Sequence, residues 1–234
     1  MSPQTRERLL GVSTATLCTA LFKRGLRHQF IQDVRPLNPN LPNMVGEAFT
    51  LRYIPAREDL NPISVFQDRA HPQRKAVEEC PPGAVFVIDS RKDARAASAG
   101  AILVTRLMTR GVAGVVTDGG FRDGLEIAKM DFPAYARGVV ASTRLSYHHA
   151  ADLNVPISCA DVAVYPGDIL VGDADGVVVL PAHLADEVAQ DAAAQEDLEQ
   201  FLLMKIDAGA PLPGTYPPNA ATLAEYEAWK KTRG

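Results

Sequence analysis

Short runs of apolar residues alternate with segments of helical periodicity through the middle of the chain. Ala84 to Ile88 and Val112 to Val116 are uninterrupted apolar runs, typical of strands covered on both faces. Between them, residues 97 to 110 predict a helix that ends at Gly111. Its inward-facing residues are expected to be Ile102, Leu103, Leu107 and Met108. Strand, helix and strand in this order predict a parallel crossover and an α/β fold.

Further elements are predicted on both sides of this crossover. Ser13 is a good N-cap for a helix that ends near Gly25, and residues 46 to 54 read as a strand. Residues 161 to 181 predict three short strands joined by Pro-Gly-Asp and Asp-Gly turns, a β-meander. A long helix from about residue 184 to residue 208 follows.

The C-terminal segment differs from the rest in composition. Residues 211 to 218 are proline-rich and predicted to be extended, and residues 222 to 231 carry Tyr226 and Trp229. Because exposed aromatic side chains are unfavourable, we expect this arm to pack on the body or on an adjacent subunit. The predicted organisation is a single α/β domain over residues 1–209, followed by a C-terminal extended arm with a short helix over residues 210–234.

Charge and cysteine content limit the partners and the compartment. The chain has 234 residues and a net charge of −4, and no run of Lys or Arg exceeds two. We therefore expect no nucleic acid partner and no membrane partner, and no apolar run is long enough to span a bilayer. Cys18, Cys80 and Cys159 are odd in number and lack Cys-x-x-Cys spacing, which predicts reduced thiols in the cytoplasm.

An Arg-Asp pair follows the second apolar run. Gly119 and Gly120 predict a turn after the strand, and Arg122 and Asp123 come next. A guanidinium binds a carboxylate bidentately, and an aspartate binds a hard metal ion, so the pair suits a 2-oxo acid. Alternatively, Asp123 caps a helix over residues 125 to 130 and Arg122 lies on the surface.

A second candidate element is the start of the crossover helix. The backbone N–H groups around Gly100, Ala101, Ile102 and Leu103 are positioned to hold an anion near the strand ends. Ser98 is the alternative partner for these groups, as a cap. If the helix start faces Arg122 and Asp123, the two elements form a pocket for a small carboxylate.

Other polar residues are assigned structural roles. Asp173 and Asp175 lack the glutamate that a calcium loop needs, and His148 and His149 lack further metal ligands. No lysine lies within an apolar strand, where its pKa would be lowered, so metal-assisted chemistry is favoured over an imine mechanism.

Several motifs in order resemble the RraA-like family over roughly residues 10 to 205. They are the run from Gly111 to Asp123, Ala-Gly-x-x-Leu at residues 99 to 103, Pro166-Gly167-Asp168, and the Gly-Asp-x-Asp-Gly-Val segment from Gly172. The family includes class II 4-hydroxy-4-methyl-2-oxoglutarate/4-carboxy-4-hydroxy-2-oxoadipate aldolases and the regulator of ribonuclease activity A. The resemblance implies an RraA-like layered α/β/β domain, swivelling-domain-like, that assembles as a homotrimer or homohexamer.

The resemblance also implies site residues and a cofactor. Asp123 would bind a divalent metal, Mg²⁺ or Mn²⁺, while Arg122 and the amides of residues 100 to 103 would bind pyruvate. The aldolases carry an acid that orients metal-bound water where this chain has Ala101. Glu126 and Glu196 are the candidate replacements for this acid. In the family, a glutamate near Glu196 reaches a neighbouring subunit's site. We therefore assign Glu196 to the metal.

The resulting expectation is a divalent-metal pyruvate lyase. It would cleave a 4-hydroxy-2-oxo acid by retro-aldol reaction, or decarboxylate an oxaloacetate-like 2-oxo acid, through an enolate that yields pyruvate. Decarboxylation needs less assistance from a base, so this activity would survive the replacement of the family's acid by Ala101. A sugar-acid-derived 2-oxo acid is a further candidate substrate. The alternative is a non-catalytic regulator that binds a partner protein, as the ribonuclease inhibitors do.

Overall fold

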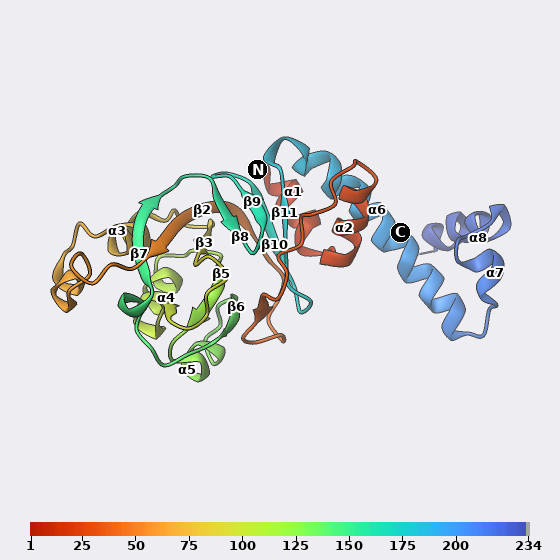
Figure 1. The fold of residues 1–234 in the computed structure, drawn as a ribbon. Coiled ribbons are helices and arrows are strands. Elements are labelled where there is room, and N and C mark those ends of the chain that lie inside the picture. Colours follow the sequence, from red (N-terminus) through yellow and green to blue (C-terminus); the bar gives the residue numbers. More distant parts are fainter. Residues whose placement is uncertain (233–234) are drawn as a thin grey trace.

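A computed structural model describes residues 1–232, and within them a sheet of nine strands forms the body of the protein (Figure 1). The strand order is β1-β6-β5-β3-β2-β10-β11, with β4 beside β5 and β7 beside β2. The strands are β1 (Arg35–Pro36), β2 (Met44–Pro55), β3 (Val85–Asp89), β4 (Ala97–Ala99), β5 (Gly114–Phe121), β6 (Ala134–Val139), β7 (His148–Leu153), β10 (Ile169–Gly172) and β11 (Val177–Leu180). A separate antiparallel pair is formed by β8 (Ile157–Cys159) and β9 (Val162–Val164).

The centre of the sheet is parallel, as the two apolar runs predict. Strands β2, β3, β5 and β6 pair in parallel, with Ala48 opposite Val85 and Val85 opposite Gly114. Every residue of β3 and β5 is buried, because helices cover one face and the β8–β9 pair covers the other. This arrangement confirms the predicted α/β/β layering.

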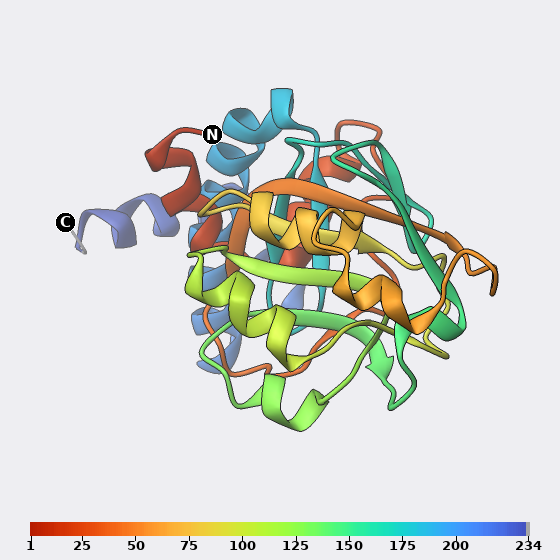
Figure 2. The same cartoon turned by 90° about the vertical axis from the view of Figure 1, so that its left-hand side faces the viewer.

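Two groups of helices pack on the sheet (Figures 1 and 2). On the layered part lie α3 (Pro72–Glu79), α4 (Ala101–Thr109) and α5 (Gly124–Ala128), whose apolar residues join those of β2, β3 and β5 in one core cluster. A second cluster joins β10 and β11 to α1 (Pro3–Leu10), α2 (Thr14–Phe22) and α6 (Ala185–Asp207). Single-turn helices are η1 (Ile63–Gln67), η2 (Arg144–Ser146) and η3 (Ala182–Leu184).

The structure corrects the predicted start of the crossover helix. Residues 97 to 99 form β4, and the helix begins only after Gly100. Ile102 is 84% exposed rather than inward, because it lies in the first turn of α4 at the edge of the sheet. Ser98 does not cap the helix, since its hydroxyl is buried against those of Ser90 and Thr117, 2.7 Å from each.

Two further predictions about local structure are wrong. Gly119 and Gly120 lie inside β5 instead of forming a turn after it. Close packing explains the first glycine, because a Cβ on Gly119 would lie 2.6 Å from Ser90 Cβ. The predicted meander is only partly present: β10 and β11 form a hairpin, whereas β9 pairs with β8.

The end of the chain extends away from the sheet (Figure 1). The distal part of α6 carries the arm, which consists of α7 (Leu212–Thr215) and α8 (Ala220–Lys231). The Phe201 ring lies 5.6 Å from that of Tyr226 and 5.4 Å from that of Trp229, between ring centroids. The arm therefore packs on this chain's own α6. The segment predicted to be extended contains the single turn of α7.

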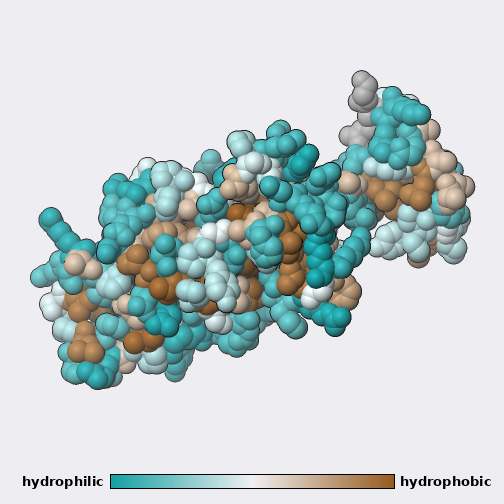
Figure 3. Space-filling model, turned by 90° about the horizontal axis from the view of Figure 1, so that it is seen from above, coloured by the Kyte–Doolittle hydropathy of each residue, from teal (hydrophilic) through white to brown (hydrophobic). Residues whose placement is uncertain are grey.

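Apolar side chains remain exposed around this arm (Figure 3). Leu203, Leu212 and Tyr216 are each more than half exposed and line an apolar groove between α6 and α7. No helix within residues 1–232 combines the length and the apolar character that crossing a membrane would require.

Candidate functional site

A cleft of about 370 Å³ opens where β4 and β5 end and α4 and α5 begin. It brings together the predicted Arg122 and Asp123 with Gly100, Ile102 and Leu103. Parallel α/β sheets bind ligands at the carboxyl ends of their strands, and this cleft occupies that position. The remaining lining residues are Phe66, Gln73, Arg74, Ala97, Ser98, Ala99, Thr143 and Arg144.

Asp123 has a backbone conformation that is rare outside glycine. Its φ is 58° and its ψ is 36°, in the left-handed region that Asp and Asn enter more readily than other non-glycine residues. The residue precedes α5, but its side chain makes no capping hydrogen bond to that helix. Instead, its Oδ2 accepts a hydrogen bond from the Ala101 amide at 3.1 Å. The carboxylate therefore joins the end of β5 to the start of α4.

Gly100 makes this contact possible. A Cβ at that position would lie 3.0 Å from Asp123 Oδ2, tighter than ordinary packing allows. The first turn of α4 therefore approaches the carboxylate with no side chain between them. The Ile102 amide has no hydrogen-bond partner among the described residues, and it remains free to bind an anion.

Arg122 is held by its backbone while its side chain is exposed. Its amide donates to the Ala99 carbonyl at 3.0 Å, which fixes the residue against the end of β4. Within residues 1–232, its guanidinium forms no hydrogen bond or ion pair. The side chain is thus available to a ligand in the cleft.

The other wall of the cleft was not predicted. It contains Arg144 on η2, Gln73 and Arg74 on α3, and Phe66 on η1. Arg144 is 3% exposed, and its Nε donates to Gln73 Oε1 at 2.8 Å. Gln73 Nε2 in turn donates to the Ser98 carbonyl at 2.8 Å, shortly before the first turn of α4. These residues form no sequence motif, because Arg144 lies 71 residues after Gln73 in the chain.

Burial perturbs the groups of this wall. It lowers the pKa of Arg144, and the neighbouring Arg74 acts in the same direction. The pKa of His71 falls to about 4, chiefly through burial and then through the positive charge of Arg144. Burial also raises the pKa of Tyr53 to about 12. His71 is therefore neutral and Tyr53 protonated at neutral pH.

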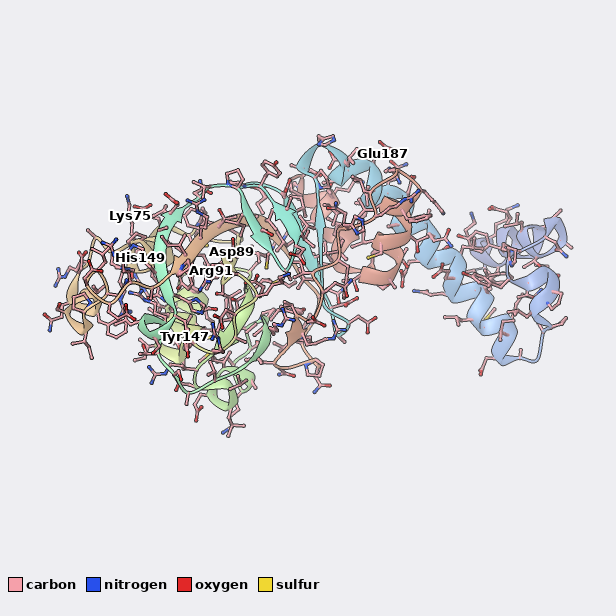
Figure 4. All side chains as sticks on the ribbon, viewed as in Figure 1. Lys75, Asp89, Arg91, Tyr147, His149 and Glu187 are labelled. Atoms are coloured by element: carbon pink, nitrogen blue, oxygen red, sulfur yellow. The ribbon has the colours of Figure 1, made fainter. Side chains whose placement is uncertain are left out.

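A buried carboxylate lies behind the cleft. Asp118, fully buried in β5, accepts hydrogen bonds from the amides of Ser90, Lys92 and Ala160 at 2.6, 2.9 and 3.0 Å. Burial raises the pKa of Asp118, and these three donors oppose that shift. Figure 4 labels Asp89 and Arg91 at the same end of β3, where the Arg91 guanidinium donates to the Tyr147 carbonyl. This network fixes the loops that leave the sheet.

Two glutamates considered from the sequence lie outside the cleft. Glu126 is exposed on α5, and Glu196 lies on α6, where its carboxylate accepts from the Ser13 hydroxyl at 3.2 Å. Helix α6, marked by Glu187 in Figure 4, lies well away from α4 and α5. Glu196 therefore does not meet Asp123 within one chain.

The Asp123 carboxylate limits which metal ions the cleft can hold. Asp123 is the one acidic side chain among the described residues that line the cleft, and residues 1–232 contain no cluster of three metal-binding side chains. Zinc sites need three or four protein ligands, whereas Mg²⁺ keeps several waters and binds through one or two carboxylates. The exposed Asp123 carboxylate therefore matches the ligand chemistry of Mg²⁺ or Mn²⁺ better than that of zinc.

Comparisons with known proteins agree with this architecture. A relative from Halalkalibacterium halodurans, named "Putative 4-hydroxy-4-methyl-2-oxoglutarate aldolase", is 36% identical over 179 residues, 76% of this chain and 77% of the relative. A 4-hydroxy-4-methyl-2-oxoglutarate aldolase from Thermus thermophilus is 32% identical over 120 residues, 51% of this chain and 71% of the relative.

A solved structure extends the agreement to the fold. RraAS2 of Streptomyces coelicolor, described as an unusual member of the RNase ES inhibitor RraA protein family, superposes with a TM-score of 0.77 at 29% identity. The match covers 87% of this chain and 98% of RraAS2. The model of the family described as Aldolase/RraA matches residues 14–179. By sequence and by fold, the chain belongs to the RraA-like family.

Proposed function

We propose that the protein is a divalent-metal lyase that breaks a carbon–carbon bond of a 2-oxo acid and yields pyruvate. The observation that carries the proposal is the convergence of Arg122, Asp123 and the first turn of α4 on one cleft. The names of the relatives from H. halodurans and T. thermophilus support an aldolase role.

Each group has a distinct task in this proposal. The Arg122 guanidinium binds the substrate carboxylate and stabilises negative charge as the enolate forms. The Ile102 amide donates a hydrogen bond to the same carboxylate. Asp123 holds the divalent cation, which would supply Lewis-acid polarisation of the 2-oxo group.

The choice between the two bond cleavages depends on a base. Retro-aldol cleavage requires removal of the proton from the 4-hydroxyl, whereas decarboxylation does not. Apart from Asp123, no Asp, Glu, His or Lys of residues 1–232 lines the cleft, and position 101 is alanine. Within one chain, the described residues therefore favour decarboxylation. We propose retro-aldol cleavage in an assembly in which the partner subunit's Glu196 supplies the missing carboxylate.

Pyruvate release tests the proposal. The full chain would be assayed with a 4-hydroxy-2-oxo acid and with oxaloacetate, with Mg²⁺ or Mn²⁺ and with chelator. We expect metal-dependent release that Arg122→Ala lowers by about 10²- to 10³-fold. Arg106→Ala, on the exposed side of α4, is the matched control and should match wild type. Equal release with chelator, or no release from any substrate, would contradict the proposal.

Metal binding is measured separately by thermal unfolding. Asp123→Asn removes the charge and retains a residue that tolerates the left-handed conformation. We expect Mn²⁺ to raise the melting temperature of the wild type but not of the variant. Identical shifts in both proteins would exclude Asp123 as the metal ligand.

The likeness to RraAS2 favours a second candidate, a regulator that binds a partner protein. In that case Arg122 and Asp123 would only fix the turn between β5 and α5. Unchanged melting with metal, together with absence of pyruvate release, would favour this function over the lyase.

We further propose that the protein acts as a homo-oligomer, a trimer or a hexamer, in the cytoplasm. The exposed Leu203, Leu212 and Tyr216 around the arm support a role in subunit contact. Deleting residues after Gly209 should lower the number of subunits in the particle, determined from its mass in solution, and an unchanged number of subunits would discard the arm as a subunit contact.

A further inference from the structure

Strand β4 is short and has a strand partner on one side only. It pairs with β5, and no other strand within residues 1–232 pairs with it. Ser98, in its middle, is fully buried, so its carbonyl oxygen has no access to water. A buried carbonyl without a donor is costly, and nearly all such groups in proteins are hydrogen-bonded. Side chains from other elements therefore have to supply the donors.

Two buried side chains donate to the Ser98 carbonyl. The Tyr53 hydroxyl, on β2, donates to it at 2.8 Å, and Gln73 Nε2, on α3, donates to the same oxygen at 2.8 Å. Gln73 Nε2 also donates to the Tyr53 hydroxyl at 2.8 Å. Tyr53 is 1% exposed and Gln73 is 3% exposed, so water does not compete for these contacts. Both lone pairs of the Ser98 oxygen are used.

Arg144 fixes the direction of these hydrogen bonds. An arginine side chain has only donors, so the Gln73 atom that its Nε contacts at 2.8 Å is the amide oxygen. The amide nitrogen then faces Tyr53 and Ser98, and its two hydrogens are donated to them. The Tyr53 oxygen accepts one of these hydrogens and directs its own proton to Ser98. The buried charge of Arg144 polarises the amide and strengthens the hydrogen bonds that follow it.

The residues directly after Ser98 carry the groups that face a ligand. The Ala99 carbonyl accepts from the Arg122 amide at 3.0 Å and holds that residue at the end of β4. Three residues further along, the Ile102 amide is the free donor in the first turn of α4. A shift of the Ser98 carbonyl would therefore move Arg122 and the Ile102 amide together.

We propose that Tyr53 and Gln73 are positioning residues that set the affinity of the cleft for the 2-oxo acid by holding the Ser98 carbonyl. The inference rests on the proposed function, in which Arg122 and the Ile102 amide bind the substrate carboxylate. Tyr53 does not line the cleft, and the Gln73 nitrogen is committed to Tyr53 and Ser98, so both act through the backbone. Because substrate and enolate carry the same carboxylate, a displaced turn should raise KM and leave kcat nearly unchanged.

Pyruvate release from oxaloacetate with Mg²⁺, above the rate without protein, measures this effect in the full chain. Tyr53→Phe and Gln73→Met each leave one donor on the Ser98 carbonyl, and each should raise KM by about 3-fold. The double variant leaves no donor and should raise KM by about 30-fold, more than the roughly ninefold product of independent effects. Tyr135→Phe, at a similarly buried tyrosine on β6 outside the cleft, is the matched control and should keep the wild-type KM. Loss of folded protein would instead lower the apparent kcat at an unchanged KM, and that result would overturn the inference.

The substitution Gln73→Glu separates positioning from stability. It gives Arg144 a carboxylate, so a purely structural role predicts that it does less harm than Gln73→Met. Positioning predicts the reverse, because the new carboxylate accepts the Tyr53 proton and the Ser98 carbonyl loses both donors at once. In the Tyr53→Phe background, the two substitutions of Gln73 should then raise KM equally. A milder effect of Gln73→Glu, or a difference that persists in that background, would overturn the inference.

Binding of oxalate distinguishes failure of this inference from failure of the lyase proposal. Oxalate has the carboxylate and the planar shape of the pyruvate enolate, and its binding requires no turnover. If the wild type releases no pyruvate, the same order of affinities for oxalate with Mg²⁺, measured by calorimetry, would retain the inference without the lyase. Equal oxalate affinities of wild type and double variant, or no binding to either, would overturn it. Pyruvate release with the same KM in wild type and double variant would overturn the inference and retain the lyase.

Discussion

The regions around Asp118 and Arg144 both bury a charged side chain next to the cleft, but they satisfy it differently. Asp118 accepts hydrogen bonds from three backbone amides in the loops after β3 and β8. Arg144 donates to one glutamine oxygen, contacts a histidine ring and a distant carbonyl, and has no carboxylate. The hydrogen bonds to Asp118 therefore hold the loops together, whereas Arg144 is buried with no carboxylate partner among residues 1–232.

Removing the Asp118 carboxylate should have the largest effect on stability. Asp118→Ala leaves three amides without an acceptor in the interior, and each such loss costs about 1–3 kcal/mol. We expect the free energy of unfolding in urea to fall by about 4 kcal/mol. Asp131→Ala, at an exposed site, should change it by less than about 0.5 kcal/mol. A small change in the free energy of unfolding of Asp118→Ala would show that the regions around Asp118 and Arg144 do not differ in what their buried charge contributes to stability.

The next largest effect on stability is expected when the pH is lowered, because His71, which lies beside Arg144, then becomes protonated. The unfolded chain protonates this histidine near its ordinary pKa of about 6.5, whereas the folded protein does so only near a pKa of about 4. The unfolded state therefore binds more protons between these values, and the free energy of unfolding falls as the pH is lowered through this range.

The size of this loss should be about 2 kcal/mol. It is measured as the difference between wild type and His71→Gln in urea unfolding at pH 7 and pH 4.5, because other groups titrate in both proteins. Arg144→Met should bring the pKa of His71 closer to 6.5 in an NMR titration, since it removes one of the charges that lower it. Parallel pH profiles for wild type and His71→Gln would contradict this account.

The smallest effect on stability should come from Arg144→Met itself. The variant leaves Gln73 Oε1 without a donor but also removes the cost of burying an unpaired charge. The two contributions oppose each other, and we expect urea unfolding to change by less than about 1 kcal/mol. A loss of stability as large as that of Asp118→Ala would show that Arg144 is a structural residue, and the two regions would then not differ.

The layered core and half of the cleft could be predicted from the sequence. Apolar runs such as Val112 to Val116 mark strands covered on both faces, and residues directly after them, such as Arg122 and Asp123, lie at the sheet edge. Gly119 gave a wrong turn prediction because a glycine required by close packing looks the same as one required by a turn. The hydrogen bond from Ala101 to Asp123 depends on tertiary structure and has no local signal.

The opposite wall could not have been predicted in this way. Phe66, Gln73 and Arg144 belong to three separate segments, and none of them lies in a periodic pattern or a motif. What distinguishes Arg144 is burial without a carboxylate, a property of packing rather than of sequence. Contacts between distant segments are the part of a site that one sequence does not specify locally.

The left-handed backbone at Asp123 gives a way to separate folding from chemistry by selection. In a library of all amino acids at this position, a screen for soluble expression should recover Gly and Asn beside Asp, because these tolerate a positive φ. A screen for growth on a substrate of the enzyme should recover Asp alone. Residues that pass the first screen and fail the second would measure what the carboxylate contributes once the backbone requirement has been met.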